Sequence, residues 1–217
     1  MLLEYAAVIV ISYLVGSIPS GYIAGRVLKG IDVRDYGSGA TGATNVARSL
    51  GRPAFVGVMF ADAVKGYVPV LVTWIAFESH GMQVASGIAA VLGHDFPIYI
   101  GFRGGRGVAT SFGVYAALAL PVSVSLVAVG LFIVLAFRYM SLMSLITVPA
   151  GAAALLAMAI VWPSEHYTYT KAVFGGFATA LVIVRHWGNI QRLVRGTEPK
   201  LGDEQRRQKA APTGRAG

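Results

Sequence analysis

A glycine-rich segment has the residue types of an anion-binding loop. Residues 36–45 read YGSGATGATN. Glycines let backbone N–H groups converge on one point and let a ligand approach the chain closely, which suits phosphate. The candidate donors, including one guanidinium, are Gly37, Ser38, Gly39, Thr41, Gly42, Thr44, Asn45 and Arg48. The alternative is a flexible loop in which glycine only turns the chain, and this segment alone does not decide between them.

The same glycines match the G-x-G-x-x-G fingerprint of dinucleotide-binding proteins, through Gly37, Gly39 and Gly42. That fingerprint requires a strand before it, a helix after it and an acidic residue about 20 residues further on. Here an apolar segment ends at Gly25, Asp62 lies within a second apolar segment, and no alternation of strand and helix is visible. A dehydrogenase is therefore excluded.

A second loop combines glycine with arginine. Residues 102–110 read FRGGRGVAT, in which Gly104, Gly105 and Gly107 alternate with Arg103 and Arg106. The topology derived below places this loop on the same side of the molecule as the first. Two such loops predict a pocket for one large anion or for two anionic groups.

A third segment, RHWGN at 185–189, supplies a histidine, the side chain that most readily moves protons near neutral pH. His186 and Asn189 are three positions apart and share a face on a helix. Trp187 and Arg185 suit the head-group region, so the segment by itself favours an interfacial anchor. Beside two anion-binding loops on the same side, a catalytic or ligand-binding His186 is the better interpretation.

Other polar residues lie at or inside apolar segments. Asp62 and Lys65 are three positions apart where unpaired charge is costly. A self-neutralising structural pair is favoured, and Lys65 as a phosphate ligand is the alternative. His94 and Asp95 are expected to pack or to brace a loop. Ser141 begins an apolar segment, where helix capping is the default and substrate contact is the alternative.

The elements that position these residues are membrane spans. The chain of 217 residues is 55% hydrophobic and only 13% charged, about half the charged share of a soluble domain. Its net charge of +8 indicates cytoplasmic loops and anionic head groups, and nucleic acid is not an expected partner. The chain has no cysteine and no visible metal-ligand cluster, so no metal or other cofactor is expected.

Seven spans are expected. The 31 uncharged residues from Gly107 to Phe137 are too long for one crossing at about 1.5 Å per residue, and Pro121 divides them. Gly21 and Gly25 are expected to let another helix approach closely. The predicted spans are Leu3–Gly25, Pro53–Phe77, Met82–Ile100, 107–119, 121–137, Met140–Trp162 and Tyr169–Val184.

Basic residues orient this bundle. With seven spans, 16 of the 18 Lys and Arg fall on one side, Lys65 lies within a span, and only Lys171 is on the other side. The positive-inside rule places the basic side, both glycine-rich loops and the C-terminus in the cytoplasm, with the N-terminus outside. The prediction is an all-α, polytopic membrane protein: a seven-helix, single-domain bundle over residues 1–200, followed by a polar, disordered cytoplasmic tail over residues 201–217.

Taken in order, these motifs resemble a known family, the bacterial membrane acyltransferases that use acyl phosphate to acylate glycerol 3-phosphate. The resemblance covers nearly the whole chain at about the family's spacing. It rests on GSIPSGYIAG (16–25), YGSGATGATNVARSLG (36–51), DAVKG (62–66), LGHDFPIYIGFRGGRGVAT (92–110), RYMSLMS (138–144) and RHWGNIQRLVRGTEPKLG (185–202).

The resemblance implies a seven-helix protein of the bacterial inner membrane that acts on fatty acyl phosphate and glycerol 3-phosphate, forming 1-acylglycerol 3-phosphate and phosphate. It also implies a soluble partner enzyme that makes the acyl phosphate. By resemblance the catalytic residues are Ser38, Arg48, Arg106, His186 and Asn189. The sequence departs from the family's usual pattern at Ala40, where Asn is usual, and at Arg106, where Lys is usual.

Two other classes of function remain open from the sequence. A transporter of an organic phosphate would also use paired glycine-arginine loops, and it predicts inverted repeats, which are not visible here. An inactive homologue is suggested only by Ala40 and Arg106. Measured turnover separates the enzyme from both alternatives.

Overall fold

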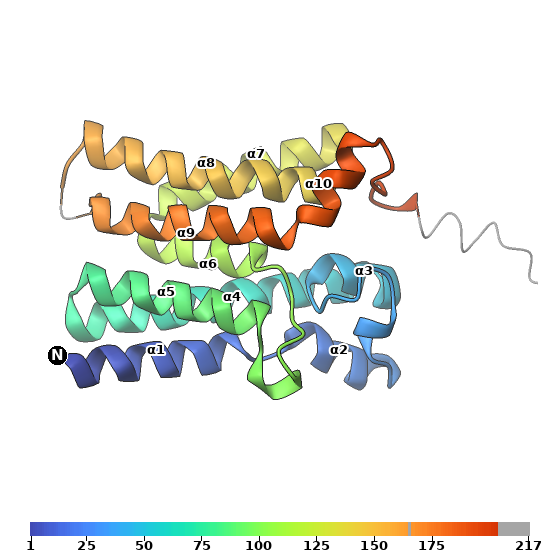
Figure 1. Ribbon diagram of the computed structural model, residues 1–217, viewed down its shortest axis with the longest axis horizontal. Helices are drawn as coiled ribbons and strands as arrows, with labels where there is room; N and C mark the ends of the chain where they lie inside the picture. Colours follow the sequence, from blue (N-terminus) through green and yellow to red (C-terminus); the bar gives the residue numbers. More distant parts are fainter. Residues whose placement is uncertain (165, 204–217) are drawn as a thin grey trace, which may run out of the picture.

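A computed structural model describes residues 1–164 and 166–203 of the chain. In this part the helices lie side by side along one axis, with the short helices α2, α3 and α10 gathered at one end (Figure 1). The helices are α1 (Leu2–Gly16), α2 (Ser20–Lys29), α3 (Ala43–Leu50), α4 (Arg52–Phe77), α5 (His80–Asp95), α6 (Val108–Leu118), α7 (Leu120–Phe137), α8 (Met140–Val161), α9 (Tyr169–Arg185) and α10 (Trp187–Val194), with 3-10 turns η1 (Val33–Asp35) and η2 (Ile98–Ile100).

Among the described residues, four stretches are long and apolar enough to cross a membrane. They are Leu2–Lys29, Arg52–Phe77, Leu120–Phe137 and Met140–Val161. The other three predicted spans correspond to α5, α6 and α9, which have 16, 11 and 17 residues, although α5 ends at Asp95 and the predicted end at Ile100 is therefore wrong. The all-helical architecture is therefore as expected, and crossing by these three shorter helices stays a prediction. The predicted disordered tail lies, from residue 204 onward, outside the described residues.

The predicted first span is not one continuous helix. The chain breaks between α1 and α2 at Ser17–Pro19, because proline has no backbone N–H to continue the ladder. Gly21 and Gly25, expected to face another helix, instead face the loop that follows α2. A Cβ at Gly21 would collide with the carbonyl oxygen of Thr41, and one at Gly25 would lie 2.7 Å from Val33 Cγ1. Gly21 therefore admits the first glycine-rich loop, and Gly25 admits the residues that lead into it.

The core lies where α5, α6, α8 and α9 meet. The fully buried Tyr115 and Phe174 pack edge to face, with ring centroids 5.2 Å apart. The Tyr115 hydroxyl donates to the carbonyl oxygen of Val148 at 2.9 Å, so its polar end is satisfied inside the bundle. Small residues bring α4 and α6 together, since a Cβ at Gly66 or Gly113 would meet the backbone of the facing helix.

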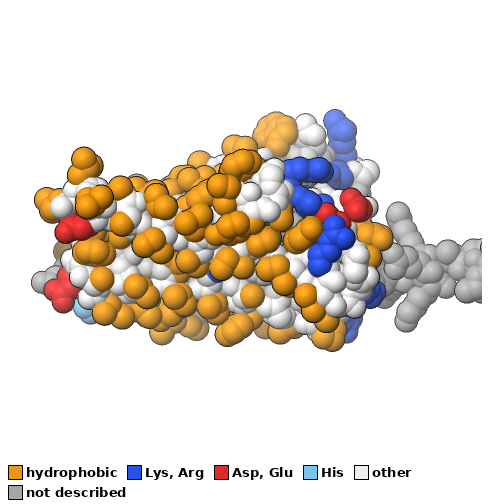
Figure 2. Space-filling view, turned by 90° about the horizontal axis from the view of Figure 1, so that it is seen from below, with side chains coloured by type: hydrophobic (Ala, Val, Ile, Leu, Met, Phe, Trp, Pro, Cys, Tyr) orange, Lys and Arg blue, Asp and Glu red, His pale blue; other side chains and the backbone are white. Residues whose placement is uncertain are grey.

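The surface divides along the long axis of the molecule. Figure 2 shows hydrophobic side chains along most of its length and the Lys and Arg side chains gathered at the end that carries α2 and α3. Apolar side chains such as Phe60, Phe132 and Leu135 are exposed on this body, at 69%, 67% and 72%. A belt of this kind matches lipid, and the basic end matches an aqueous face with anionic head groups.

The intramembrane charges are paired in the interior. Lys65 Nζ lies 2.8 Å from Asp62 Oδ1 and donates to the carbonyl oxygen of Ile18 at 2.7 Å. That carbonyl is at the break between α1 and α2, where the helical ladder is interrupted. His94 Nδ1 lies 3.5 Å from the same Asp62 oxygen. Lys65 thus neutralises a buried carboxylate, as the structural interpretation expects, and it donates a hydrogen bond to a carbonyl oxygen at the helix break.

This pairing predicts a specific stability pattern. Lys65→Met should lower the melting temperature strongly, because it removes the ammonium group that neutralises the buried Asp62 carboxylate, at a cost of about 3–5 kcal/mol. Asp62→Asn/Lys65→Met should melt above Lys65→Met, because the stranded charge is gone. Thermal unfolding of the three proteins in one detergent measures this. A double variant that melts below Lys65→Met would contradict the pairing.

Candidate active site

The two glycine-rich loops touch each other at the basic end. The backbone N–H of Thr41, in the first loop, donates to the carbonyl oxygen of Gly104, in the second, at 3.3 Å. The structure therefore brings together two segments that are about 60 residues apart in the chain. Whatever anion one loop binds is also near the other.

Asn45 holds the first loop in shape. Its Nδ2 donates to the carbonyl oxygens of Val33 at 2.8 Å, Tyr36 at 3.0 Å and Ala40 at 2.9 Å, and its Oδ1 accepts from the backbone N–H of Ser38 at 2.9 Å. Asn45 is buried, so the loop uses all of its amide. Its contacts are those of a loop brace.

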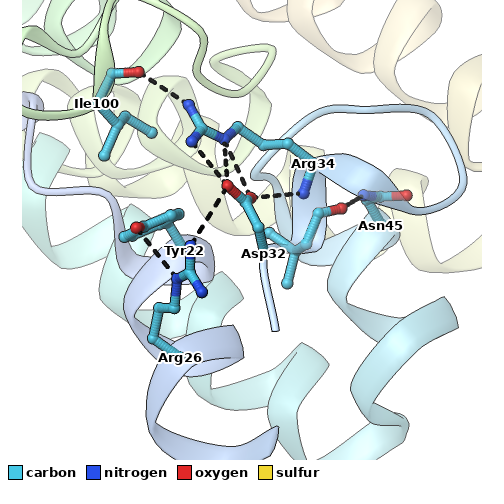
Figure 3. Close-up of polar contacts among 7 residues, drawn as sticks. Tyr22, Arg26, Asp32, Arg34, Asn45 and Ile100 are labelled. Atoms are coloured by element: carbon cyan, nitrogen blue, oxygen red, sulfur yellow. Dashed lines mark hydrogen bonds and ion pairs between the residues drawn. The ribbon is translucent and has the colours of Figure 1, made fainter. Parts of the chain in front are cut away.

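An ionic cluster that the sequence analysis did not single out anchors the same loop (Figure 3). Arg34 donates to Asp32 twice, from Nε to Oδ1 at 3.0 Å and from Nη2 to Oδ2 at 2.7 Å. Its Nη1 donates to the carbonyl oxygen of Ile100 at 2.8 Å. The Arg34 hydrogen bonds lower the pKa of Asp32, which keeps it ionised. Arg26 of α2 lies 4.0 Å from Asp32. The cluster fixes the loop to α2 and to η2.

The glycines of the second loop dock onto the end of α5. The Gly105 N–H donates to the carbonyl oxygen of His94 at 3.0 Å, and a Cβ at Gly105 would collide with the His94 ring. A Cβ at Gly107 would lie 3.1 Å from Asp95 Oδ1, and Gly107 has a left-handed φ of +68°. Glycine is therefore required here for close packing as well as for any N–H nest.

Arg185 ties the second loop to α9. Its Nη2 donates to the carbonyl oxygen of Gly105 at 2.6 Å, and its Nε lies 3.3 Å from Asp95 Oδ2. Its guanidinium also lies 5.1 Å from the centroid of the Phe96 ring. His94 and Asp95 thus brace this loop, in the role expected for them.

Arg106 begins a chain of hydrogen bonds that joins the second loop, α10, α8 and the residues that follow α10. Its Nη1 donates to Asn189 Oδ1 at 2.7 Å, and Asn189 Nδ2 donates to Glu198 Oε1 at 2.6 Å. Ser141 Oγ donates to the same Glu198 oxygen at 2.7 Å, and Arg192 Nε donates to Glu198 Oε2 at 2.8 Å. Two predicted catalytic residues are therefore in direct contact, and Ser141 lies beside them.

The charge around Arg106 is predominantly positive. Burial lowers the pKa of Arg106, and the nearby guanidiniums of Arg192, Arg185 and Arg48 lower it further, while Glu198 opposes them. A guanidinium stays protonated under all ordinary conditions. Arg106 and these three arginines, here termed the positive cluster, therefore carry a surplus of positive charge. A site of this kind favours a ligand with two or more negative charges.

His186 lies where α9 ends and α10 begins. The ring is buried, and its Nδ1 lies 3.0 Å from the carbonyl oxygen of Val182. A carbonyl only accepts, so the neutral ring carries its proton on Nδ1 and presents Nε2 as an acceptor. Burial, with the Arg106 charge second, lowers the pKa of His186 to about 4. The imidazole is therefore neutral at physiological pH. Trp187, next to it, is exposed, as a head-group anchor would be.

The remaining predicted residues lie in different surroundings. Ser38 is exposed on the first loop, and its hydroxyl makes no hydrogen bond within the described part of the chain. Arg48 is half-buried beside Gly37. Thr44 is half-buried in the first turn of α3. Lys65 makes its contacts in the bundle interior with Asp62.

Sequence reasoning missed Glu198, which lies in the segment 185–202 quoted for the family resemblance. Its position between Arg195 and Lys200 makes it the one carboxylate in a basic run, and that contrast was the available signal. It also missed Arg192 as the partner of Glu198.

Comparison with known proteins places this chain in a family. Residues 6–196 match the family model described as glycerol-3-phosphate acyltransferase. The chain belongs to this family. It is 41% identical to the glycerol-3-phosphate acyltransferase of Parasynechococcus marenigrum over 204 residues, which cover 94% of this chain and 93% of that protein. It is 40% identical to that of Gloeobacter violaceus over 199 residues, covering 88% and 92%.

A solved structure is similar throughout. The crystal structure of PlsY, an integral membrane glycerol 3-phosphate acyltransferase, in its glycerol 3-phosphate form, superposes with a TM-score of 0.83 at 36% identity. The match covers 93% of this chain and 98% of that chain. A second PlsY structure, in the lysophosphatidic acid form, matches with a TM-score of 0.80. The chain is therefore a multi-pass membrane acyltransferase of this family.

Proposed function

We propose that this protein transfers a fatty acyl group from acyl phosphate to the 1-hydroxyl of glycerol 3-phosphate, the first step of phospholipid synthesis. The products are 1-acylglycerol 3-phosphate and inorganic phosphate. The observation that carries the proposal is the surplus of guanidiniums around Arg106, where the two glycine-rich loops meet. Both substrates carry a phosphate group with one or two negative charges. The family's name identifies one of them, the acceptor glycerol 3-phosphate.

The reaction forms one bond and breaks one bond. The 1-hydroxyl oxygen bonds to the acyl carbon, and the bond between that carbon and the phosphate oxygen breaks, so the electron pair leaves with phosphate. The hydroxyl proton passes to His186 Nε2 or to a substrate phosphate oxygen. Phosphate is a good leaving group, so a covalent acyl-enzyme is unnecessary. Positioning and charge neutralisation then supply the catalysis.

We assign roles from the contacts of each side chain. Arg106 and Arg48 neutralise the phosphate groups, because both lie in the positive cluster. Ser38, with its exposed hydroxyl, donates to the oxyanion that develops on the acyl carbonyl. Asn189 keeps Arg106 in place through the 2.7 Å hydrogen bond. His186 presents an unprotonated Nε2 to the attacking hydroxyl.

The proposed location follows from the surface. The acyl chain lies among the apolar helices, continuous with lipid, while the phosphates lie at the basic end of the molecule. The basic end supports a reaction at the cytoplasmic face of the bacterial inner membrane, where the positive-inside rule expects it. A soluble enzyme that forms acyl phosphate would supply the donor there.

A choice among donors tests the function. Purified protein in detergent is given glycerol 3-phosphate and palmitoyl phosphate, palmitoyl-CoA or palmitoyl-acyl carrier protein. We expect product only with palmitoyl phosphate, with phosphate release that requires both substrates. Turnover with a thioester donor instead would reject the acyl phosphate assignment. Binding of glycerol 3-phosphate without turnover of any donor would favour transport or an inactive homologue.

His186 gives a pH-dependent prediction. In the folded protein its pKa is about 4, against about 6.5 in an unfolded chain. Between these values the unfolded state binds more protons, so stability contributed by the neutral ring is lost as pH falls from 6.5 toward 4. Carbon-13 NMR of labelled histidine in the ligand-free protein should show the ring neutral from pH 8 to 5. His186→Gln identifies the signal, and a midpoint near 6.5 would contradict the burial argument.

A further inference from the structure

The segment 197–203, here termed the C-terminal strap, lies beyond the region that matches the family model, which ends at residue 196. The strap folds back onto the start of α8. The Thr197 N–H donates to the carbonyl oxygen of Arg192 at 2.8 Å. Leu201 and Arg138 are joined by two hydrogen bonds of 2.7 Å, and Arg138 Nη2 lies 3.4 Å from Asp203 Oδ1. The strap is thus fixed at both ends.

Glu198 projects from the strap into the positive cluster. It is only 9% exposed, although it is a carboxylate at the aqueous end of the molecule. Burial raises its pKa, but hydrogen bonds from Ser141, Asn189 and Arg192 outweigh burial and lower the pKa overall. The carboxylate is therefore ionised and accepts from three side chains on two helices. Such a buried, fully bonded charge fixes the groups around it.

The amide of Asn189 is held at both ends. Its Oδ1 accepts from Arg106, and its Nδ2 donates to Glu198. A flipped amide would set its NH₂ group against the guanidinium and its oxygen against the carboxylate, so neither hydrogen bond would form. Arg106 and Glu198 therefore together determine which way Asn189 points, and the Glu198 carboxylate fixes the side of the amide that faces away from Arg106.

We propose that Glu198 is a positioning residue for the acyl transfer: its carboxylate orients the Asn189 amide, which holds the Arg106 guanidinium toward the anionic substrate. The inference rests on the proposed function, because it gives Arg106 a substrate to bind. It differs from a simple charge-balancing role, in which Glu198 competes with substrate phosphate for Arg192 and its removal improves binding. It also differs from a role confined to anchoring the strap.

A double-mutant cycle tests the proposal. We expect Glu198→Gln to lower kcat by at least about tenfold and to change KM for glycerol 3-phosphate by much less. Asn189→Ala should lower kcat similarly, and the double variant should be no slower than Asn189→Ala, because Glu198 acts through Asn189. Losses that multiply in the double variant would overturn the proposal. So would a Glu198→Gln protein with wild-type kcat or with a higher kcat/KM.

Matched variants separate positioning from anchoring. Asp203→Asn removes the ion pair at the far end of the strap without touching Asn189, and it should keep kcat within about twofold. An equal loss in Asp203→Asn would show that the strap as a whole is needed and would reject the specific role of Glu198. Each variant must elute from size exclusion as the wild type does. Glu198→Asp, whose shorter carboxylate cannot reach both Asn189 and Arg192, replaces Glu198→Gln if that variant does not fold.

The dissociation constant for glycerol 3-phosphate is also measured by calorimetry for the wild type, both single variants and the double variant. Wild-type protein that turns over acyl phosphate while the cycle is multiplicative would reject the inference and keep the proposed function. Wild-type protein without turnover would reject the proposed function. The coupling of Glu198 to Asn189 is then tested by the dissociation constants. Effects of the two substitutions that multiply would reject the coupling, and a double variant that binds no more weakly than Asn189→Ala would support it.

Discussion

Arg106→Ala should lower kcat/KM by about 10²- to 10³-fold, the cost of removing a preorganised group that stabilises developing charge. Arg106 is largely buried, donates to Asn189 at 2.7 Å and lies at the junction of the two glycine-rich loops. Its loss would remove charge at the phosphate site and leave the Asn189 oxygen without its donor. Phosphate release with palmitoyl phosphate and glycerol 3-phosphate measures the effect.

Arg106→Lys is the matched control for this prediction. Lysine keeps the positive charge, but it lacks the planar fork that spans a phosphate and an amide oxygen. We expect it to retain most of the activity lost in Arg106→Ala. Wild-type kcat/KM in Arg106→Ala would remove this arginine from the site. Equal loss in both variants would mean that geometry, and not charge, is what Arg106 contributes.

Gly105→Ala should abolish most activity and lower the melting temperature by several degrees. A Cβ at this position would collide with the His94 ring, which is 4% exposed and packed beside Asp62. The ring cannot retreat without breaking that contact, so the loop must move and carry Arg106 with it. Overpacking of this kind costs about 1–3 kcal/mol.

Gly176→Ala provides the comparison for this effect. Gly176 lies in α9, is exposed, and a Cβ added there would have no neighbouring atom within 4 Å. Alanine at this position should leave both the melting temperature and turnover unchanged or raise stability slightly, since alanine favours helix over glycine. If Gly105→Ala behaves like Gly176→Ala, the close docking of the second loop onto α5 is wrong.

Long apolar segments predicted α4 and the helices from α6 to α9 closely. The expected spans Pro53–Phe77 and 121–137 correspond to α4 and α7 to within a residue, because uninterrupted apolar length is a local property of the chain. The break at Pro19 was not predicted. The carbonyl oxygen of Ile18, at this break, accepts a hydrogen bond from Lys65, which is 47 positions away. A local sequence pattern does not show such a distant partner.

The short helices and the reasons for the glycines were harder to predict. Helices α3 and α10 have eight residues each and lie among loop residues at the basic end, so no long apolar run signals them. The glycines at 104 and 105 were predicted as anion-loop residues. Whether a glycine serves a ligand or close packing depends on its neighbour in space, here His94 on α5.

The site was predictable in its residue types and not in its connections. His186 and Asn189 were identified from their spacing and from the loops expected on the same side. The hydrogen bonds from Arg106 to Asn189 and from Asn189 to Glu198 join residues up to 83 positions apart, and only the fold brings Arg106 and Asn189 together. Glu198 lies only nine positions from Asn189, but its contact with Ser141 spans 57 positions, and the sequence does not show that contact.

An oxygen-18 experiment tests the central claim most directly. Palmitoyl phosphate labelled at the oxygen that bridges carbon and phosphorus is incubated with glycerol 3-phosphate and the purified wild-type chain. Attack on the acyl carbon predicts unlabelled 1-palmitoylglycerol 3-phosphate and labelled inorganic phosphate in equal amounts, read by mass spectrometry. Failure to form the acylated product in protein that binds glycerol 3-phosphate, or label retained on the acyl product, would contradict the account.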